Sequence, residues 1–140
     1  MPVVELRRGA PARAIGLPER GGNVFEDDLA QRVFNYVEAH YAEHISLCDV
    51  ARELGYSAPH LTHTFRRLTG TAVTAWIIRR RIRAAQQLLL DGDGTVASVC
   101  ECVGFNDLCY FTRQFARITG MTPRRYRTAE RSVVAPPKVS

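Results

Sequence analysis

The chain has 140 residues, the size of one compact domain, and carries a net charge of +5. No apolar run approaches the roughly 18 residues of a membrane-spanning helix, and the opening MPVVELRRGAPARAIG lacks the apolar segment of a secretory signal. These features exclude a membrane-spanning protein. They predict a soluble cytoplasmic protein with no membrane partner, and its positive charge favours anionic ligands.

The N-terminal third of the chain is expected to form an arm and two helices. Residues 1–24 are rich in Pro, Gly and Arg without a sustained apolar period, which predicts a flexible arm. Helical periodicity begins in DDLAQRVFNYVEAHYAEH and predicts a first helix that ends near His44. Ser46 then offers a capping hydroxyl, with Asp49 three residues later, so a second helix should begin at the next residue and stop at Gly55.

Two further helices follow in the middle of the chain. A third helix is expected over residues 58–69, because Gly70 can take the left-handed conformation that ends a helix. The apolar residues of AVTAWIIRRRIRAAQQLLLDG predict a long fourth helix over residues 73–91, closed by Gly92. Ala72 precedes this helix and has no polar side chain, so the helix is expected to start without a good cap.

The same signals then recur. Thr95 should cap a fifth helix that runs to Val103, after which Gly104 makes a turn. Either Asn106 or Asp107 should cap a sixth helix.

The sixth helix should end near Thr119, and the pair Thr122 and Pro123 should start a short seventh helix, RRYR, before a flexible tail over residues 129–140. The chain is therefore predicted to be all-α, with seven helices in a domain over residues 25–128. This domain divides into a first unit over residues 27–70, a linker helix over residues 73–91 and a second unit over residues 95–128.

The two units resemble each other in sequence. Val50, Leu54, Gly55 and Tyr56 precede Val99, Val103, Gly104 and Phe105 by 49 residues, and Leu61, Phe65, Thr69 and Gly70 precede Phe111, Phe115, Thr119 and Gly120 by 50 residues. In each unit a small residue, Ala51 or Cys100, lies four positions before the turn glycine, where it lets two helices approach closely. A helix, a glycine turn, an aromatic residue and a second helix together form the pattern of a helix-turn-helix.

Arginines follow the same repeat. Residues 26–57 contain seven acidic residues, whereas residues 58–90 contain six arginines and residues 109–128 contain five, with no acidic residue in either stretch. Each basic stretch begins near the second helix of a unit. Only one of the 19 basic residues is lysine, which reflects either a GC-rich coding sequence or a use for guanidinium groups, which bind phosphate and guanine edges bidentately.

The second helix of a helix-turn-helix lies in the major groove of DNA and presents its outer face to the bases. Leu61 with Phe65, and Phe111 with Phe115, are spaced i, i+4 and should face the core. The outward residues, and so the candidate base readers, are Pro59, Thr62, His63 and Arg66 in the first unit and Leu108, Cys109, Thr112, Arg113 and Arg117 in the second. His60 is assigned to packing or backbone bonding at the helix start.

The linker helix explains why two units are needed. A helix of this length spans about 28 Å, since each residue adds about 1.5 Å. Successive major-groove segments on one face of the duplex are about 34 Å apart. A single chain is therefore predicted to bind double-stranded DNA as a monomer and to read two adjacent segments.

These motifs resemble the AraC/XylS-type bacterial transcription activators over about residues 27–128. The most specific segment is GFNDLCYFTRQFARITGMTPRRYR, and GYSAPHLTHTF in the first unit also fits. The resemblance implies a seven-helix domain with two helix-turn-helix units, which binds an asymmetric promoter site and activates transcription through RNA polymerase. Carried over by position, it implies base reading at Pro59, Thr62, His63 and Arg66, and at Cys109, Thr112 and Arg113.

Phosphate contacts are assigned to Arg67, Arg79, Arg80 and Arg124. The run RRRIR over residues 79–83 either grips phosphates or forms the solvated face of the linker helix. The resemblance implies a structural role for Arg81, paired with an acidic residue of the first unit.

No cofactor, metal or catalytic site is expected. Three of the four cysteines lie in one predicted unit, so reduced thiols are the default, and Cys100 with Cys102 has no second Cys or His pair at a zinc spacing. Cys109 either makes a plain contact with a base or acts as a redox switch. No Ser, His and Asp order, paired acids beside a His, or phosphate loop points to an enzyme.

Two alternatives stay open. The domain is either a sequence-specific reader or an interaction module that docks on RNA polymerase or another regulator. The chain is either a short regulator without a sensor domain or a fragment of a longer, effector-responsive one.

Overall fold

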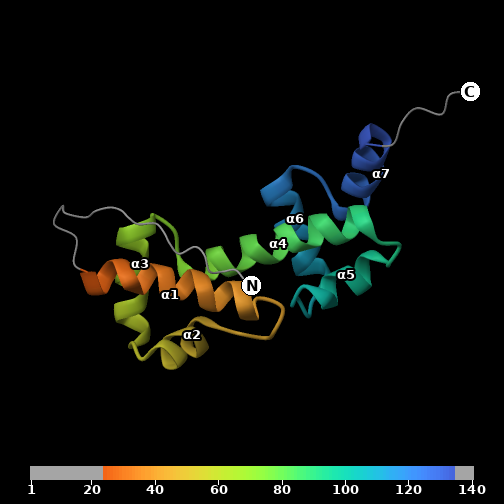
Figure 1. Cartoon of the computed structure of the whole chain (residues 1–140). Coiled ribbons are helices and arrows are strands. Elements are labelled where there is room, and N and C mark those ends of the chain that lie inside the picture. Colours follow the sequence, from red (N-terminus) through yellow and green to blue (C-terminus); the bar gives the residue numbers. More distant parts are fainter. Residues whose placement is uncertain (1–23, 135–140) are drawn as a thin grey trace, which may run out of the picture.

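The computed structural model describes the backbone of residues 24–134 and the side chains of residues 28–130. Within these residues the chain forms seven α-helices and no strand, which confirms the predicted fold class (Figure 1). The helices are α1 (Val24–His40), α2 (Leu47–Leu54), α3 (Ala58–Thr69), α4 (Val73–Asp91), α5 (Val96–Cys102), α6 (Leu108–Thr119) and α7 (Pro123–Val134). The predicted N-terminal arm lies outside the described residues apart from its last position, Val24, where the prediction is wrong because α1 begins at this residue.

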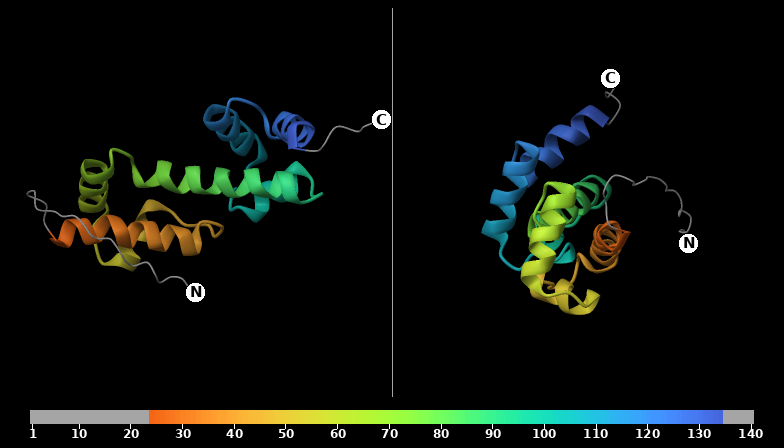
Figure 2. Two further views of the ribbon diagram at one scale, coloured as in Figure 1. Left: turned by 45° about the horizontal axis from the view of Figure 1, so that its top comes forward. Right: turned by 90° about the vertical axis from the view of Figure 1, so that its left-hand side faces the viewer.

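Helix α4 is the axis of the molecule. Helices α1, α2 and α3 lie around its N-terminal half, and α5, α6 and α7 lie around its C-terminal half (Figures 1 and 2). Both groups of helices therefore share one rigid element, as the length of the predicted linker helix implied.

The buried core is divided in the same way. The first cluster contains Leu29, Val33, Val37, Val50, Ala51, Leu61, Phe65, Val73 and Ile77. The second contains Ile82, Ala85, Leu89, Val99, Cys100, Val103, Phe105, Phe111 and Phe115. Helix α4 changes cluster between Ile77 and Ile82, so each half of this helix completes the core of a different unit.

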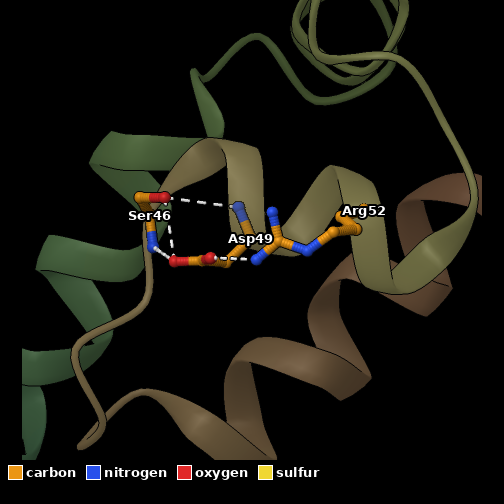
Figure 3. Close-up of polar contacts among 3 residues, drawn as sticks. All are labelled: Ser46, Asp49 and Arg52. Carbon is orange, nitrogen blue, oxygen red and sulfur yellow. Dashed lines mark hydrogen bonds and ion pairs between the residues drawn. The ribbon is translucent and has the colours of Figure 1, made fainter.

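The predicted caps are formed. The Ser46 hydroxyl accepts a hydrogen bond from the Asp49 amide at 3.2 Å, and the Asp49 carboxylate accepts one from the Ser46 amide at 2.9 Å, which completes a capping box (Figure 3). Asp49 also holds Arg52, which is one turn further along α2. Thr95 caps α5, and Asp107 rather than Asn106 caps α6. These bonds fix where each helix begins.

The C-terminal ends of α3 and α6 are also alike. Thr69 donates its hydroxyl to the Phe65 carbonyl at 2.8 Å, and Thr119 donates to the Phe115 carbonyl at 2.8 Å. The glycine after each threonine has a positive φ, so the chain leaves each helix in the left-handed conformation. The internal repeat predicted from sequence is therefore present in the backbone.

The ends of two helices differ from the predictions by more than one residue. Helix α1 ends at His40, not near His44, because the chain turns back there and the Glu43 amide bonds the His40 carbonyl at 2.9 Å. Helix α7 continues to Val134. The prediction of a flexible tail from residue 129 is therefore wrong for residues 129–134, which are helical. The sequence after RRYR has no Gly or Pro before Pro136, and Ala129 and Glu130 favour a helix.

Candidate nucleic-acid interface

The start of α3 is fixed by local bonds and by packing. The Ser57 hydroxyl accepts a hydrogen bond from the His60 amide at 3.2 Å, and Pro59 lies in the first turn, where no backbone donor is needed. Leu61 and Phe65 are fully buried, as predicted. The opposite face of α3 must therefore point to solvent.

The predicted readers of the first unit lie on that outer face. Pro59, Thr62, His63 and Arg66 are exposed, and so is Arg67. They line a surface hollow of about 760 Å³ together with Leu47 and Ala58. The sequence did not single out Leu47 or Ala58 as part of the site. Leu47 comes from the start of α2, and only the folded hairpin brings it beside α3.

Helix α6 presents an equivalent outer face in the second unit. Phe111 and Phe115 are fully buried. The predicted readers Leu108, Cys109, Arg113 and Arg117 are exposed, and Thr112 is half-buried. Leu108 is a large apolar side chain that is 44% exposed at the first position of the helix. An apolar group in that position is suited to contact a thymine methyl.

Neighbouring side chains hold two of the α6 arginines in place. The Arg113 guanidinium lies 5.9 Å from the centre of the Tyr110 ring, and Tyr110 is itself 36% exposed. Arg117 donates from Nε to the Gln114 side-chain oxygen at 3.2 Å. Sequence reasoning missed Tyr110, although it lies three positions before the predicted reader Arg113 and therefore on the same side of the helix.

The arginines of α4 have different surroundings. Arg79 is exposed. Arg80 instead makes a bidentate ion pair with Glu38 of α1, with both donor–acceptor distances at 2.8 Å, and its guanidinium lies 4.2 Å from the centre of the Tyr41 ring. The pKa of Glu38 is lowered, chiefly by the hydrogen bond from Arg80. The Arg80 guanidinium thus holds α4 to α1 through Nε and Nη2, and its assignment to a phosphate contact stays a prediction that this geometry disfavours.

Arg81 also differs from its expected role. It bonds the carbonyl oxygens of Tyr41 and Glu43, at 2.7 and 2.8 Å, and not an acidic side chain. The expectation of a structural residue is confirmed, but its partner is the backbone of the first unit. Burial lowers the pKa of Arg81, yet a guanidinium stays protonated at neutral pH.

Helix α7 carries the remaining predicted phosphate contact. Arg124 is exposed in its first turn, beside the exposed Arg125. Arg127 turns inward, where it donates to the Leu89 carbonyl at 2.9 Å and caps the end of α4. Helix α7 thus presents Arg124 and Arg125 outward and uses Arg127 to hold the linker helix.

Other kinds of site find no support in the described residues. Among residues 24–134, no helix is long and apolar enough to cross a membrane. The part of the chain that the structure describes also holds no group of His, Cys, Asp and Glu side chains arranged to bind a metal ion.

Comparison with known proteins agrees with this geometry. Residues 50–129 match the family model of a helix-turn-helix domain. The chain is 35% identical over 97 residues to the HTH-type transcriptional regulator ExsA of Pseudomonas aeruginosa, which is 69% of this chain and 35% of that protein. It is 33% identical over 102 residues to the arabinose operon regulatory protein of Salmonella typhimurium, which is 72% of this chain and 36% of that protein.

A solved structure extends the likeness to three dimensions. The DNA-binding domain of AdpA, a global transcriptional factor in complex with a target DNA, superposes with a TM-score of 0.70 at 32% identity, over 76% of this chain and 95% of that one. The chain spans about a third of the length of ExsA and of the arabinose regulator. On the family model, these relatives and this fold, the chain belongs to the AraC-type family of helix-turn-helix transcription regulators.

Proposed function

We propose that this chain binds double-stranded DNA with sequence specificity, with α3 and α6 in successive major-groove segments. The observation that carries the proposal is the attachment of two exposed reading faces to opposite halves of one continuous helix. Helix α4 has 19 residues. Its length of about 28 Å approaches the 34 Å or so between major-groove segments on one face of a duplex.

The base readers are the exposed side chains of the two reading helices. In the first unit they are Pro59, Thr62, His63 and Arg66, and in the second they are Leu108, Cys109, Thr112, Arg113 and Arg117. Arg66, Arg113 and Arg117 carry the guanidinium fork that bonds guanine edges, while Leu108 and the apolar wall of the hollow beside α3 suit thymine methyl groups. Cys109 acts as a small contact residue.

Exposed arginines outside the reading faces bind phosphates. These are Arg67, Arg79 and Arg124, and we add Arg125, which is exposed beside Arg124. Such contacts supply affinity and register without sequence information. With Arg80 held by Glu38, these residues account for the salt dependence that we expect of binding.

The two reading faces carry different side chains, so the site on DNA is asymmetric and one chain suffices to occupy it. We further propose that the bound chain activates transcription from the bacterial chromosome in the cytoplasm, by contact with RNA polymerase. The support for this step is the family, whose members in the comparisons are transcription regulators.

Selection from a randomised duplex pool tests the proposal. The purified chain is incubated with the pool at about physiological salt, and the bound sequences are recovered and read. We expect an asymmetric motif of two boxes whose centres lie about 10 bp apart, because one helical turn separates major-groove segments on one face. Recovery of no motif, with only salt-sensitive binding to every sequence, would contradict the proposal and favour an interaction module.

A further inference from the structure

The two units meet at Arg81, in the middle of α4. The last buried α4 residue of the first core cluster is Ile77, and the first of the second cluster is Ile82. No buried apolar residue of α4 lies between them in the described structure. Ile78 is partly buried and packs against the second cluster, so no α4 side chain between Ile77 and Ile82 joins the two apolar cores, and polar groups make the contact described next.

Arg81 connects the two units directly. Its Nε donates to the Tyr41 carbonyl at 2.7 Å and its Nη2 donates to the Glu43 carbonyl at 2.8 Å, both in the turn after α1. The same guanidinium lies 5.6 Å from the centre of the Phe105 ring, next to the turn of the second helix-turn-helix. One half-buried side chain thus touches the loop that leads into the first unit's α2 and the turn that leads into α6.

Among the described residues, the equivalent arginine of the first unit makes no such bridge. Arg32 stands 49 residues before Arg81, and its guanidinium lies 5.4 Å from the centre of the Tyr56 ring. Tyr56 has a hydroxyl that accepts a hydrogen bond from Arg32 at 3.1 Å, so this arginine is satisfied within its own unit. Phe105 has no hydroxyl. The donors of Arg81 are therefore left to bond the other unit.

Gly104 completes the junction. A Cβ atom at this position would lie 2.6 Å from the Tyr41 carbonyl oxygen and 2.9 Å from Nε of Arg81. Its φ of +103° is also one that other residues rarely adopt. The matching glycine of the first unit, Gly55, has a φ of +82° but has nothing within 4 Å of the same Cβ position. Both turns favour glycine because of their positive φ. The second turn needs it for a further reason, because the first unit is packed against Gly104 and leaves no room for a Cβ atom.

We infer that Arg81 and Gly104 are positioning residues that fix the angle between the two reading helices and thereby select the spacing of the two DNA boxes. This inference rests on the proposed function. A shift of one base pair moves a box by about 3.4 Å along the duplex axis and turns it about the axis by roughly a tenth of a full turn. A rigid junction keeps the two reading helices at a fixed separation, so the chain cannot engage both boxes after such a shift. A loosened junction lets the second unit move with its box.

The test measures binding to a series of duplexes that differ only in spacing. The two boxes are taken from the pool selected with the native chain, and the spacer is shortened or lengthened by one and two base pairs. Affinities are measured by fluorescence anisotropy for the native chain and for Arg81→Ala, Arg81→Lys and Gly104→Ala. The matched controls are Arg32→Ala and Gly55→Ala, which remove an arginine over an aromatic ring or strain a turn without touching the junction.

For the native chain we expect a loss of about tenfold or more at altered spacings, since simultaneous engagement of two sites depends on geometry. Arg81→Ala and Gly104→Ala should bind the native spacing more weakly and show a profile flattened to within about threefold. Arg32→Ala and Gly55→Ala should keep the native profile even where they lower stability. Arg81→Lys keeps the positive charge and the aliphatic stem but lacks the fork of donors. Its spacing profile should therefore fall between those of the native chain and Arg81→Ala.

The outcomes separate the two proposals. A native chain that selects no motif overturns the proposed function and this inference with it. A native chain that selects two boxes but tolerates every spacing overturns only the inference. Junction variants that keep the native spacing profile also overturn it. Circular dichroism checks folding, and loss of helix in all three junction variants, with both controls folded, would assign Arg81 and Gly104 to folding and not to spacing.

Discussion

Arg32 and Arg81 occupy equivalent positions 49 residues apart, and each places its guanidinium over the aromatic ring that follows a turn glycine. Helices α1 and α4 also begin 49 residues apart, at Val24 and Val73. The repeat therefore includes the helix before each helix-turn-helix, and α4 serves both as the linker and as the first helix of the second copy. The units are joined by sharing an element, not by a separate connector.

Single substitutions on the reading faces should change specificity at one box. Arg113→Ala is expected to cost about 1 to 3 kcal/mol on the preferred sequence and to relax discrimination only in the box read by α6. His63→Ala should do the same in the box read by α3. Anisotropy titrations against duplexes with one base pair changed at a time measure both effects. Equal losses on every sequence would show that these side chains bind phosphates instead.

Two adjacent arginines of α4 should behave differently. Arg79→Ala is expected to weaken binding to all sequences alike and to reduce the slope of log K against log salt by about one. Arg80→Ala should leave that slope unchanged, because its guanidinium is bound by Glu38 and lies over Tyr41. It should instead lower the free energy of unfolding by about 1 kcal/mol. An equal change of slope in both variants would restore Arg80 to the phosphate-binding set.

Local hydrogen bonding explains which parts of the fold could be predicted. The starts of α2, α5 and α7 follow from Ser46, Thr95 and the pair Thr122 and Pro123, and these signals lie within three residues of the bonds they make. The end of α1 could not be predicted in this way. The carbonyl of Tyr41 bonds Arg81, 40 residues later, and the apolar period of α1 continues past the point where the chain turns.

The same distinction applies to the site. The buried pairs spaced i, i+4 predicted most of the exposed side chains of α3 and α6, but they missed Tyr110, and the predicted reader Thr112 is half-buried. In the run RRRIR, sequence alone gave no way to separate Arg79 from Arg80. The difference comes from Glu38, which lies 42 residues earlier and is brought to Arg80 only by the packing of α1 on α4.

The Glu38–Arg80 ion pair should make stability depend on pH in the acid range. The pKa of Glu38 is lowered from its ordinary 4.5, chiefly by the hydrogen bond from Arg80. A carboxylate with a lowered pKa stabilises the fold above its unfolded-state pKa, and this contribution is lost as pH falls through the folded-state value. The carboxylate is 63% exposed, so the contribution is below about 1 kcal/mol.

Glu38→Gln removes this contribution. Urea unfolding of the variant should show a smaller fall in stability below pH 4.5 than the native chain shows. The fall should not vanish, because the pKa of Asp49 is also lowered, chiefly by the hydroxyl of Ser46. If the stability of the variant falls below pH 4.5 as steeply as that of the native chain, the ion pair does not persist in solution.

The cap of α2 should contribute measurably to stability. Ser46→Ala removes the acceptor for the Asp49 amide and one half of the capping box (Figure 3). The expected loss in the free energy of unfolding is about 1 kcal/mol, within the usual range of about 0.5 to 2 for an N-cap. Ser98→Ala is a suitable control, because its hydroxyl bonds the Thr95 carbonyl from within the first turn of α5 and caps no helix. Equal effects in both variants would argue against a specific role for the cap.

The start of α4 offers the opposite test, a stabilising change. Ala72 occupies the N-cap position with φ −74° and ψ 151°, and it makes no side-chain cap. Ser57 caps α3 from nearly the same conformation, φ −76° and ψ 151°, where its hydroxyl accepts from the amide three residues later. Ala72→Ser should therefore supply an acceptor for the Ala75 amide without moving the backbone.

We expect Ala72→Ser to raise the free energy of unfolding by about 0.5 to 1 kcal/mol, measured as a higher urea midpoint at an unchanged slope. Ala72→Gly is the control, since it caps the helix less well than serine and adds no side-chain acceptor. A serine variant no more stable than the native chain would mean that the α4 start is already satisfied by solvent. Helix α4 carries both units, but Ala72 lies at its start and away from the junction at Arg81. The stabilised variant should therefore keep the native preference for the spacing of the two boxes.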